Sequence, residues 1–257
     1  MRIAWWAFAV LIAGPPAGHA QSAWVSLFDG KTMAGWDDPR QKTPPGDGWT
    51  IDDGCLKANR SPRITEDLFS KDTYRDFELA WEWKIAPGAN SGVKYRIQER
   101  LFLASYAGHR FEDTVNYSML HKPTVRPDHG QEYVVGFEYQ LLDNARNSDA
   151  RVGVDHQAGA VYDIMGPEKD MTRPVGEFNE SRLVVKGNHV EHWLNGVKIV
   201  DAELDSPQVV ERTAKRWGRG SPVFNLLTKQ PHKECPISLQ NHGDEAWFRN
   251  LKIRRLD

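Results

Sequence analysis

The chain has 257 residues, 40% of them hydrophobic, and its 33 basic and 35 acidic residues give a formal net charge of −2 at pH 7. This balance excludes the strongly basic surface with which proteins bind nucleic acids, so we expect no nucleic-acid partner. The length suits a single all-β domain, because sandwiches and barrels commonly reach about 200–250 residues.

Residues 1–20 have the pattern of a secretory signal. Met1 and Arg2 provide a positively charged start, an apolar run covers 3–13, and small residues precede a cleavage point after Ala20. The apolar run is too short to span a bilayer, and no stop-transfer pattern follows it. We therefore expect a mature domain over residues 21–257 that has no membrane span and is exported, either to the periplasm or out of the cell.

The two cysteines, Cys55 and Cys235, lie far apart in the sequence. An exported protein meets oxidising conditions, so one disulfide between them is the first alternative. A pair of buried, unlinked thiols that pack as small hydrophobic groups is the second. The residues alone leave both alternatives open.

The N-terminal half of the chain predicts short strands joined by tight turns. A short strand and a turn are expected over 24–36, and an Asp-Gly pair predicts a hairpin over 49–57. The strongest strand is expected over 77–85, where apolar and polar residues alternate. The turn over 86–92 leads to another strand over 93–98, and we expect these two strands to pair as neighbours.

The middle of the chain is less regular. Residues 99–132 have no clean period but contain several aromatic residues together with His109, His121 and His129. We expect an ordered rim or lid there, because long loops inside compact domains are usually functional or disordered. The three histidines lack metal-ligand spacing. A strand is predicted over 158–163.

The C-terminal part contains the clearest hairpin, over 190–200, with Asn195 and Gly196 as its two-residue turn. One amphipathic helix is expected over 208–217, and further strands over 237–242 and 246–254. Many short alternating strands with almost no helix predict a β-sandwich.

Three of the predicted strands carry polar side chains on one face, and alternation puts each set on a single side of its strand. The sets are Lys94, Arg96 and Gln98; Glu138 and Gln140; and Ser238, Gln240 and His242. If the strands are neighbours, these side chains form a polar floor that can hydrogen-bond sugar hydroxyls and move protons. Each set alone could equally be the solvated face of an ordinary antiparallel strand.

Several other chemistries lack their motifs. The sequence contains no G-x-S-x-G, no H-E-x-x-H, no C-x-x-C and no glycine-rich phosphate loop. A conventional glycosidase needs two carboxylates that flank the scissile bond. Glu138 with Asp143, or with Glu82, could supply them, but nothing in the sequence singles out either pair.

A series of motifs in order along the chain resembles the 3-keto-disaccharide hydrolase family, long known as a domain of unknown function. Among them are L-F-D-G-K (27–31), N-S-G-V-K-Y-R (90–96), G-F-E-Y-Q-L-L-D-N (136–144) and I-S-L-Q-N-H-G (237–243). The resemblance implies a concanavalin A-like jelly-roll β-sandwich of two antiparallel sheets with a concave polar face.

The resemblance also implies an exported enzyme that acts on 3-keto-glycosides or 3-keto-disaccharides. A base would remove the C2 proton next to the C3 ketone, the C1 substituent would leave, and water would add, giving net hydrolysis. The alternative is a non-catalytic carbohydrate-binding module on the same sandwich, because fold alone does not fix function.

The matched positions assign candidate roles by resemblance. Glu138 or His242 would transfer the proton, a divalent metal ion is allowed, and Asp143 is its candidate ligand. The candidate substrate-binding residues are Asn90, Ser91, Arg96, Gln140, Tyr162 and Gln240. Two departures from the family pattern are Cys55 and Cys235, which replace other residue types and so favour a bridge between them. Asn241, where the family usually has Asp, puts any role of that carboxylate in doubt.

Overall fold

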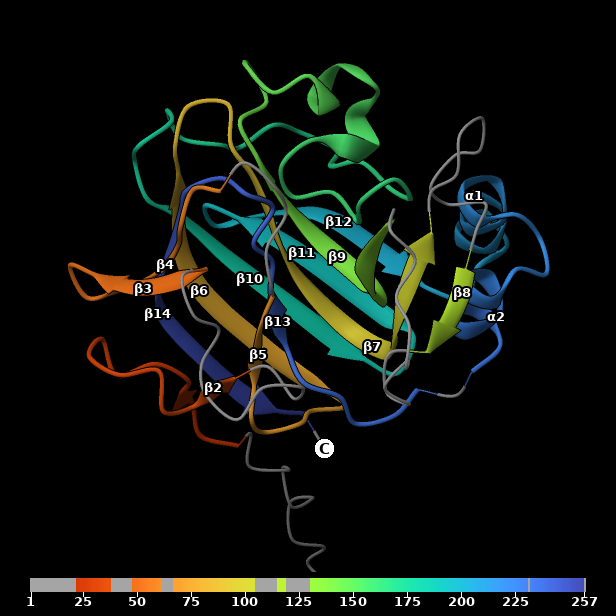
Figure 1. Cartoon of the computed structure of the whole chain (residues 1–257), viewed down its shortest axis with the longest axis horizontal. Helices are drawn as coiled ribbons and strands as arrows, with labels where there is room; N and C mark the ends of the chain where they lie inside the picture. Colours follow the sequence, from red (N-terminus) through yellow and green to blue (C-terminus); the bar gives the residue numbers. More distant parts are fainter. Residues whose placement is uncertain are drawn as a thin grey trace, which may run out of the picture.

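The chain folds into two antiparallel β-sheets packed face to face (Figure 1). This is a computed structural model, and it describes residues 22–37, 48–61, 67–104, 115–118, 130–230 and 232–256. The expected signal sequence, His109, His121 and His129 lie outside the described residues. None of the described helices has the length and apolar run of a membrane span.

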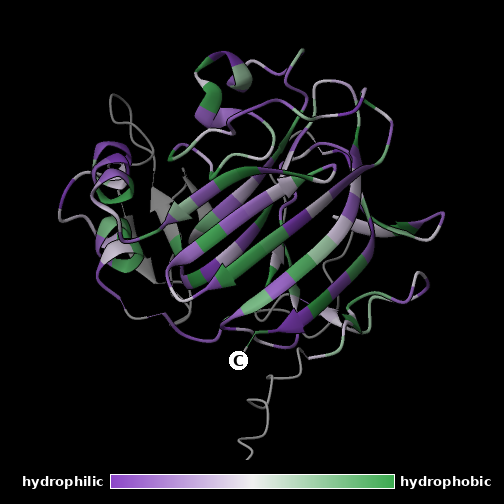
Figure 2. Ribbon diagram, turned by 180° about the vertical axis from the view of Figure 1, so that it is seen from behind, coloured by the Kyte–Doolittle hydropathy of each residue, from purple (hydrophilic) through white to green (hydrophobic). Residues whose placement is uncertain are grey.

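The first sheet, which we call the back sheet, has the strand order β12-β11-β10-β6-β14-β4-β3, with β1 paired to β14. Seen from behind, its strands show alternating hydrophilic and hydrophobic bands (Figure 2), as expected when one face is buried and the other faces solvent. Its strands are β1 (Val25–Ser26), β3 (Trp49–Asp52), β4 (Cys55–Ala58), β6 (Phe77–Ile85), β10 (Asn179–Lys186), β11 (His189–Leu194), β12 (Val197–Glu203) and β14 (Ala246–Arg255).

The second sheet, the front sheet, has the order β2-β5-β13-β7-β8, and β9 pairs with β7. Its strands are β2 (Trp36–Asp37), β5 (Leu68–Ser70), β7 (Asn90–Ala104), β8 (Val115–Ser118), β9 (Gly130–Leu142) and β13 (Ser238–Leu239). The jelly-roll β-sandwich of two antiparallel sheets is therefore confirmed.

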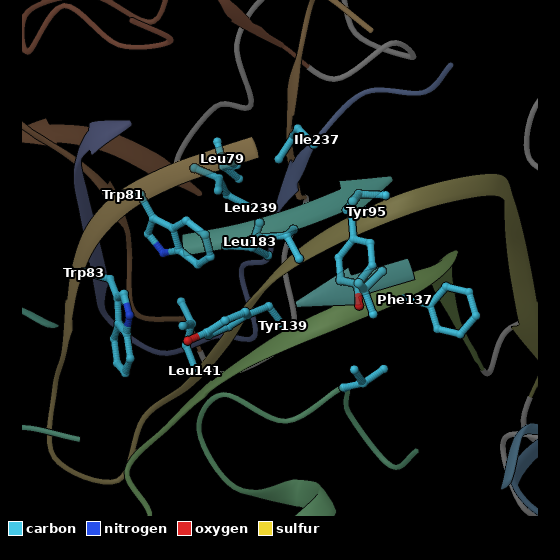
Figure 3. Close-up of a cluster of buried hydrophobic side chains, with 14 of the residues drawn as sticks. Leu79, Trp81, Trp83, Tyr95, Phe137, Tyr139, Leu141, Leu183, Ile237 and Leu239 are labelled. Atoms are coloured by element: carbon cyan, nitrogen blue, oxygen red, sulfur yellow. The ribbon is translucent and has the colours of Figure 1, made fainter. Parts of the chain in front are cut away.

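The core lies between the inner faces of the two sheets. Trp81 and Trp83 of β6 and Tyr139 of β9 are almost fully buried there, and Figure 3 shows the three rings facing into one apolar cluster. A polar chain crosses this core: Trp83 Nε1 donates to Ser181 Oγ at 2.8 Å, and Ser181 Oγ donates to Tyr139 Oη at 3.0 Å. Burying these groups is tolerable because each has a partner.

The two expected hairpin turns are confirmed. Asp53 and Gly54 have φ of 46° and 72°, and Asn195 and Gly196 have φ of 48° and 82°. Positive φ at both central residues defines the two-residue turn whose twist matches paired strands, and Asn, Asp and Gly tolerate it best.

The expected pairing of the strands around the turn at 86–92 is wrong. β6 belongs to the back sheet and β7 to the front sheet, so the turn carries the chain across the sandwich. Asp143 fixes this crossover, because its Oδ2 accepts the Gly88 N–H at 2.7 Å. Alternation shows which face of a strand is buried, but not which sheet the strand joins.

The irregular stretch expected over 99–132 is partly strand, since β7 continues to Ala104 and β9 begins at Gly130. The strand expected over 158–163 reduces to isolated bridges of Val161 with Tyr139 and Met165. The expected helix is α1 (Pro207–Trp217), but a second one, α2 (Pro222–Thr228), follows it. Ser221 caps α2 by accepting the Phe224 N–H at 3.1 Å.

Both cysteines are buried free thiols, so the second alternative for them is the one found. Cys55 lies in β4 of the back sheet. The backbone of Cys235 forms an isolated β-bridge with Tyr74, and its Sγ accepts the Ile97 N–H from β7 of the front sheet. Burial raises the pKa of the Cys235 thiol to about 11, so it remains protonated.

Candidate active site

The three strands with polar faces are neighbours in the front sheet, which was the condition for a polar floor that the sequence left open. Lys94 of β7 pairs with Ser238 of β13 on one side and with Glu138 of β9 on the other. The next row has Gly92 at its centre, because Gly92 pairs with Gln140 and its carbonyl accepts the Gln240 N–H at 2.9 Å. We call Lys94, Glu138, Gln140, Ser238 and Gln240 the polar floor.

Glu138 is the carboxylate of this floor, and its side chain leans over Gly92. A Cβ on Gly92 would lie 2.2 Å from Glu138 Oε1, so glycine is needed there to leave space. Glu138 is only 8% exposed. Burial raises its pKa to about 7, against the opposing effect of Lys94 and Arg216. A carboxyl group with this pKa can accept or give a proton near neutral pH.

The Gln140 side-chain amide lies between Glu138 and the backbone of β7. With its nitrogen turned toward them, it donates to Glu138 Oε1 and to the Ser91 carbonyl, both at 3.2 Å. The opposite orientation gives one longer contact, from Nε2 to Asn90 Oδ1 at 3.4 Å, and brings the amide oxygen against the carboxylate. We adopt the first orientation, because it pairs donors with acceptors at both ends.

Lys94 supplies a buried positive charge beside Glu138. Its Nζ lies 3.6 Å from Asp67 Oδ2, which also accepts from Ser238 Oγ at 3.2 Å. Burial opposes the charge, but Asp67 and Glu138 outweigh it and raise the pKa of Lys94. The group therefore remains an ammonium ion, and its Nζ also lies 5.0 Å from the centre of the Tyr133 ring.

A second cation, Arg216, comes from α1. Its guanidinium donates to the Tyr162 carbonyl at 3.2 Å, approaches Asp163 Oδ2 at 3.4 Å, and lies over the Tyr162 ring at 4.7 Å. Burial opposes its charge, but Tyr133, Asp163, Tyr162 and Glu138 raise the pKa of Arg216.

Tyr162 heads a hydrogen-bonded chain in the loop after β9. Its hydroxyl donates to Asp149 Oδ2 at 3.0 Å, and the other oxygen of Asp149 is 2.9 Å from His156 Nδ1. Burial raises the pKa of Tyr162, so the hydroxyl keeps its proton. The Tyr162 N–H donates to the Glu138 carbonyl at 3.0 Å, which ties this loop to the polar floor.

The other predicted residues on this side of the sheet have distinct surroundings. Burial, and then the charge of Lys94, lower the pKa of His242, so its imidazole is neutral at physiological pH. Ser91 Oγ donates to the Gln240 carbonyl at 2.8 Å, and the Asn90 N–H donates to Asp244 Oδ2 at 3.0 Å. The Gln240 Oε1 atom is buried and has no hydrogen-bond partner among the described residues.

Two predicted site residues are not brought to Glu138. Arg96 lies at the bulge in β7 with a φ of 51°, and its guanidinium donates to Asn188 Oδ1 at 2.8 Å. Asp143 accepts the backbone N–H groups of Gly88, Ala145 and Arg146 at 2.7, 3.1 and 3.2 Å. These bonds explain the burial of Asp143 without a metal.

One group of potential metal ligands occurs in the described part of the chain, and it lies on the back sheet. Ligand atoms of His189, Glu191 and Asp201 are within 4.8 Å of one another. Lys198 already pairs with both carboxylates, with its Nζ 3.2 Å from Glu191 Oε1. The described residues around Glu138 form no comparable group, so the polar floor does not fit a metal site.

Sequence reasoning assigned no role to the four charged residues that act on Glu138, which are Lys94, Arg216, Asp67 and Asp149, nor to His156, which contacts Asp149. Lys94 was on a recognised polar strand face, and its position opposite Glu138 could have identified it as a site residue. The other four come from loops and from α1, where no periodic signal links them to the sheet.

Comparison with known proteins identifies the family of this chain. The family model described as a 3-keto-alpha-glucoside-1,2-lyase-like domain matches residues 23–254. A 3-keto-disaccharide hydrolase of Bacteroides thetaiotaomicron is 29% identical, over 91% of this chain and 79% of that protein.

Two crystal structures of candidate glycosyl hydrolases from Parabacteroides distasonis have the same fold. The first has a TM-score of 0.66 at 25% identity and covers 91% of this chain and 94% of that one. The second has a TM-score of 0.58 at 24% identity and covers 91% of this chain and 100% of that one. The match over nearly the whole described sandwich places this chain in the 3-keto-alpha-glucoside-1,2-lyase-like family.

Proposed function

We propose that this protein cleaves glycosides whose C3 hydroxyl has been oxidised to a ketone, with Glu138 as the general base. The observation that carries the proposal is the buried Glu138 carboxyl group, whose pKa is raised to about 7, beside the buried Lys94 and the partly buried Arg216. Family membership and the 3-keto-disaccharide hydrolase among its relatives support the choice of substrate class.

The chemistry follows from the acidity that a C3 ketone gives to the C2 proton. Glu138 takes this proton, and the electrons of the C2–H bond form an enolate with charge on the ketone oxygen. The enolate then forms a C1=C2 double bond as the C1–O bond breaks, and the departing oxygen takes up a proton. Water finally adds its oxygen to C1 while C2 recovers a proton, so that the net reaction is hydrolysis.

Lys94 and Arg216 would stabilise the charge that develops during proton removal. Lys94 is buried and Arg216 is partly buried, and both interact electrostatically with Glu138. Fixed charges in a site with little water stabilise a developing oxyanion far more than they would in bulk water. We assign the stabilisation of this charge to Lys94 and Arg216.

Neither the neutral His242 imidazole nor the Tyr162 hydroxyl, whose pKa burial raises, is acidic enough to give up a proton near neutral pH. Glu138, which has taken the C2 proton, is therefore assigned to pass that proton to the departing oxygen.

Asn90 lies on the same face of β7 as Lys94 and remains a candidate sugar ligand. Ser91 does not, because it is buried on the opposite face and its hydroxyl donates to the Gln240 carbonyl. Arg96 has no part in the proposal, because its guanidinium is bound by Asn188. Export to the periplasm or the exterior is proposed from the N-terminal sequence alone.

The test uses the purified protein with a 3-keto-disaccharide and its unoxidised parent, followed by proton NMR in deuterated water. We expect exchange or loss of the C2 proton and release of the C1 substituent for the keto-sugar alone. Glu138→Gln should reduce turnover by at least about 10³-fold and leave binding of the keto-sugar within about threefold, because it removes the base but keeps the shape. Binding without turnover by the wild-type protein would contradict the proposal and favour the carbohydrate-binding module.

A further inference from the structure

Two glutamines lie side by side with Glu138 and have opposite hydrogen-bonding states. Gln140 of β9 and Gln240, the residue that follows β13, flank Gly92, and the Glu138 carboxylate leans into the space that Gly92 leaves. Resemblance alone gave both glutamines one role, that of sugar ligand. Their surroundings separate them.

Gln140 has no N–H donor left for a substrate. An amide nitrogen carries two N–H donors, and those of Gln140 are directed at Glu138 Oε1 and at the Ser91 carbonyl. The residue is 1% exposed, so it has almost no surface with which to touch a ligand. Its donors instead hold the Oε1 oxygen of Glu138 in place.

Gln240 has the opposite character. Its side chain is partly exposed, and its Oε1 is a buried acceptor with no donor in the described structure. A buried polar atom without a partner is unfavourable, so a ligand hydroxyl that donates to it gains a full hydrogen bond. The sugar hydroxyls next to the reacting carbon are donors of this kind.

We infer that Gln140 is a positioning residue, which fixes the Glu138 carboxylate through Oε1, and that Gln240 is the specificity-determining residue, which accepts a hydrogen bond from a sugar hydroxyl. The inference rests on the proposed function for its substrate, but the role of Gln140 does not require any turnover. It also predicts that substitutions of the two glutamines, both of which occur on predicted polar strand faces, give different phenotypes.

The first experiment measures the titration of Glu138 directly in the ligand-free protein, by ¹³C NMR of glutamate side-chain carboxyl groups, with Glu138→Gln to assign the signal. Gln140→Met keeps a side chain of similar length but removes the donors. Losing one donor to a carboxylate should raise the Glu138 midpoint by about one pH unit. The matched Gln240→Met should leave it unchanged, since Lys94, Arg216, Asp67 and Asp149, the charges that act on Glu138, are the same in both variants.

The second experiment measures kinetics and binding with the keto-sugar. Gln140→Met should move the acid limb of the kcat/KM profile upward by the same pH interval and leave KM nearly unchanged. Gln240→Met should leave the limb in place and raise KM by about 2–10-fold, the loss of one neutral hydrogen bond. Binding to the same variant in the Glu138→Gln background should weaken by the same factor.

The outcomes separate the two proposals. If no keto-sugar turns over but Gln140→Met still shifts the Glu138 midpoint, the proposed reaction is wrong and the positioning role stands. A midpoint that stays fixed in Gln140→Met, with a raised KM instead, would overturn the inference. If Gln140→Met does not fold, Gln140→Asn, which keeps an amide too short to reach Oε1, replaces it under the same criteria.

Discussion

Glu138 occupies a position where its negative charge is costly to the folded protein. Burial disfavours the ionised form, and the nearby Lys94 and Arg216 compensate only in part. The unfolded chain ionises the same group near its ordinary pKa of 4.5. Between pH 4.5 and about 7 the folded state therefore holds a proton that the unfolded state has lost, and stability falls as pH rises through this window. Above it the penalty reaches roughly 3 kcal/mol as an upper limit.

A pH-dependent gain in stability is the resulting prediction for Glu138→Gln. The variant should be more stable than the wild type by about 1–3 kcal/mol at pH 8, because it has no charge to bury. The gain should shrink toward zero at about pH 3.5, where the wild-type carboxyl is mostly neutral in both states. Urea denaturation at the two pH values measures it. A gain of equal size at both pH values would show that the Glu138 charge is not the cause.

At the scale of single residues, the sequence located the carboxylate and both glutamines but not their partners. Alternation along β9 and β13 is a local property, so it identified Glu138, Gln140 and Gln240. Alternation placed Arg96 wrongly, because the bulge after Tyr95 interrupts the pattern and the Arg96 side chain contacts Asn188 instead. Arg216 comes from a helix more than a hundred residues away from β7, and no local pattern reports that contact.

At the scale of elements, the site depends on three strands meeting in the right register. A shift of β9 by one residue would turn Glu138 into the apolar core and bring Tyr139 out. The register is held by large core side chains on the opposite face, Tyr139 among them, whose hydroxyl donates to the Trp193 carbonyl of the back sheet at 3.0 Å. The core thus fixes which side chains face the substrate.

Gly92→Ala tests how closely the strands are fitted around Glu138. The added Cβ would meet the end of the Glu138 side chain rather than backbone, so the strand should persist and the carboxylate should move. We expect kcat/KM to fall by about 10²-fold, the effect of an ångström-scale misplacement of a catalytic group, with a loss of stability near 1 kcal/mol.

The kinetics and thermal unfolding of Gly92→Ala are compared with those of Gly35→Ala, which serves as the control. Gly35 is in the turn before β2, and a Cβ there would come no closer than 3.3 Å to the Leu27 carbonyl oxygen. Similar losses of activity in both variants would argue against a specific fit between Gly92 and Glu138.

The sequence predicted most elements correctly as strand, turn or helix, but it did not predict correctly which sheet each strand joins. The alternating strand Phe77–Ile85 and the Asn195-Gly196 hairpin were predicted because both signals are short-range. The crossover after Ile85 was not predicted, since strands of either sheet must bury one face in the same core. Helix α2 and the extensions of β7 and β9 were not predicted from the sequence and were found only in the three-dimensional structure.

At the scale of the whole molecule, the two sheets have different outer faces. The front sheet carries a buried carboxylate between two cations, whereas the back sheet carries exposed ion pairs such as Lys198 with Glu191. Exposed pairs of this kind contribute little to stability and are screened by salt. The sandwich is instead held by its shared apolar core, including Trp81 against Tyr139 with ring centroids 5.0 Å apart.

Because that core joins the sheets, no covalent link between them is required, and we predict that reduction will not change stability. Cys55 belongs to the back sheet and Cys235 borders the front sheet, and both are free and buried. A thiol reagent should label neither in the folded protein and both in urea, and a reductant should shift the melting temperature by less than about 1 °C. A disulfide would contribute about 2–4 kcal/mol, so its reduction would lower the melting temperature by roughly 5–15 °C. A shift of that size would mean that a bridge, and not core packing alone, holds the sheets together.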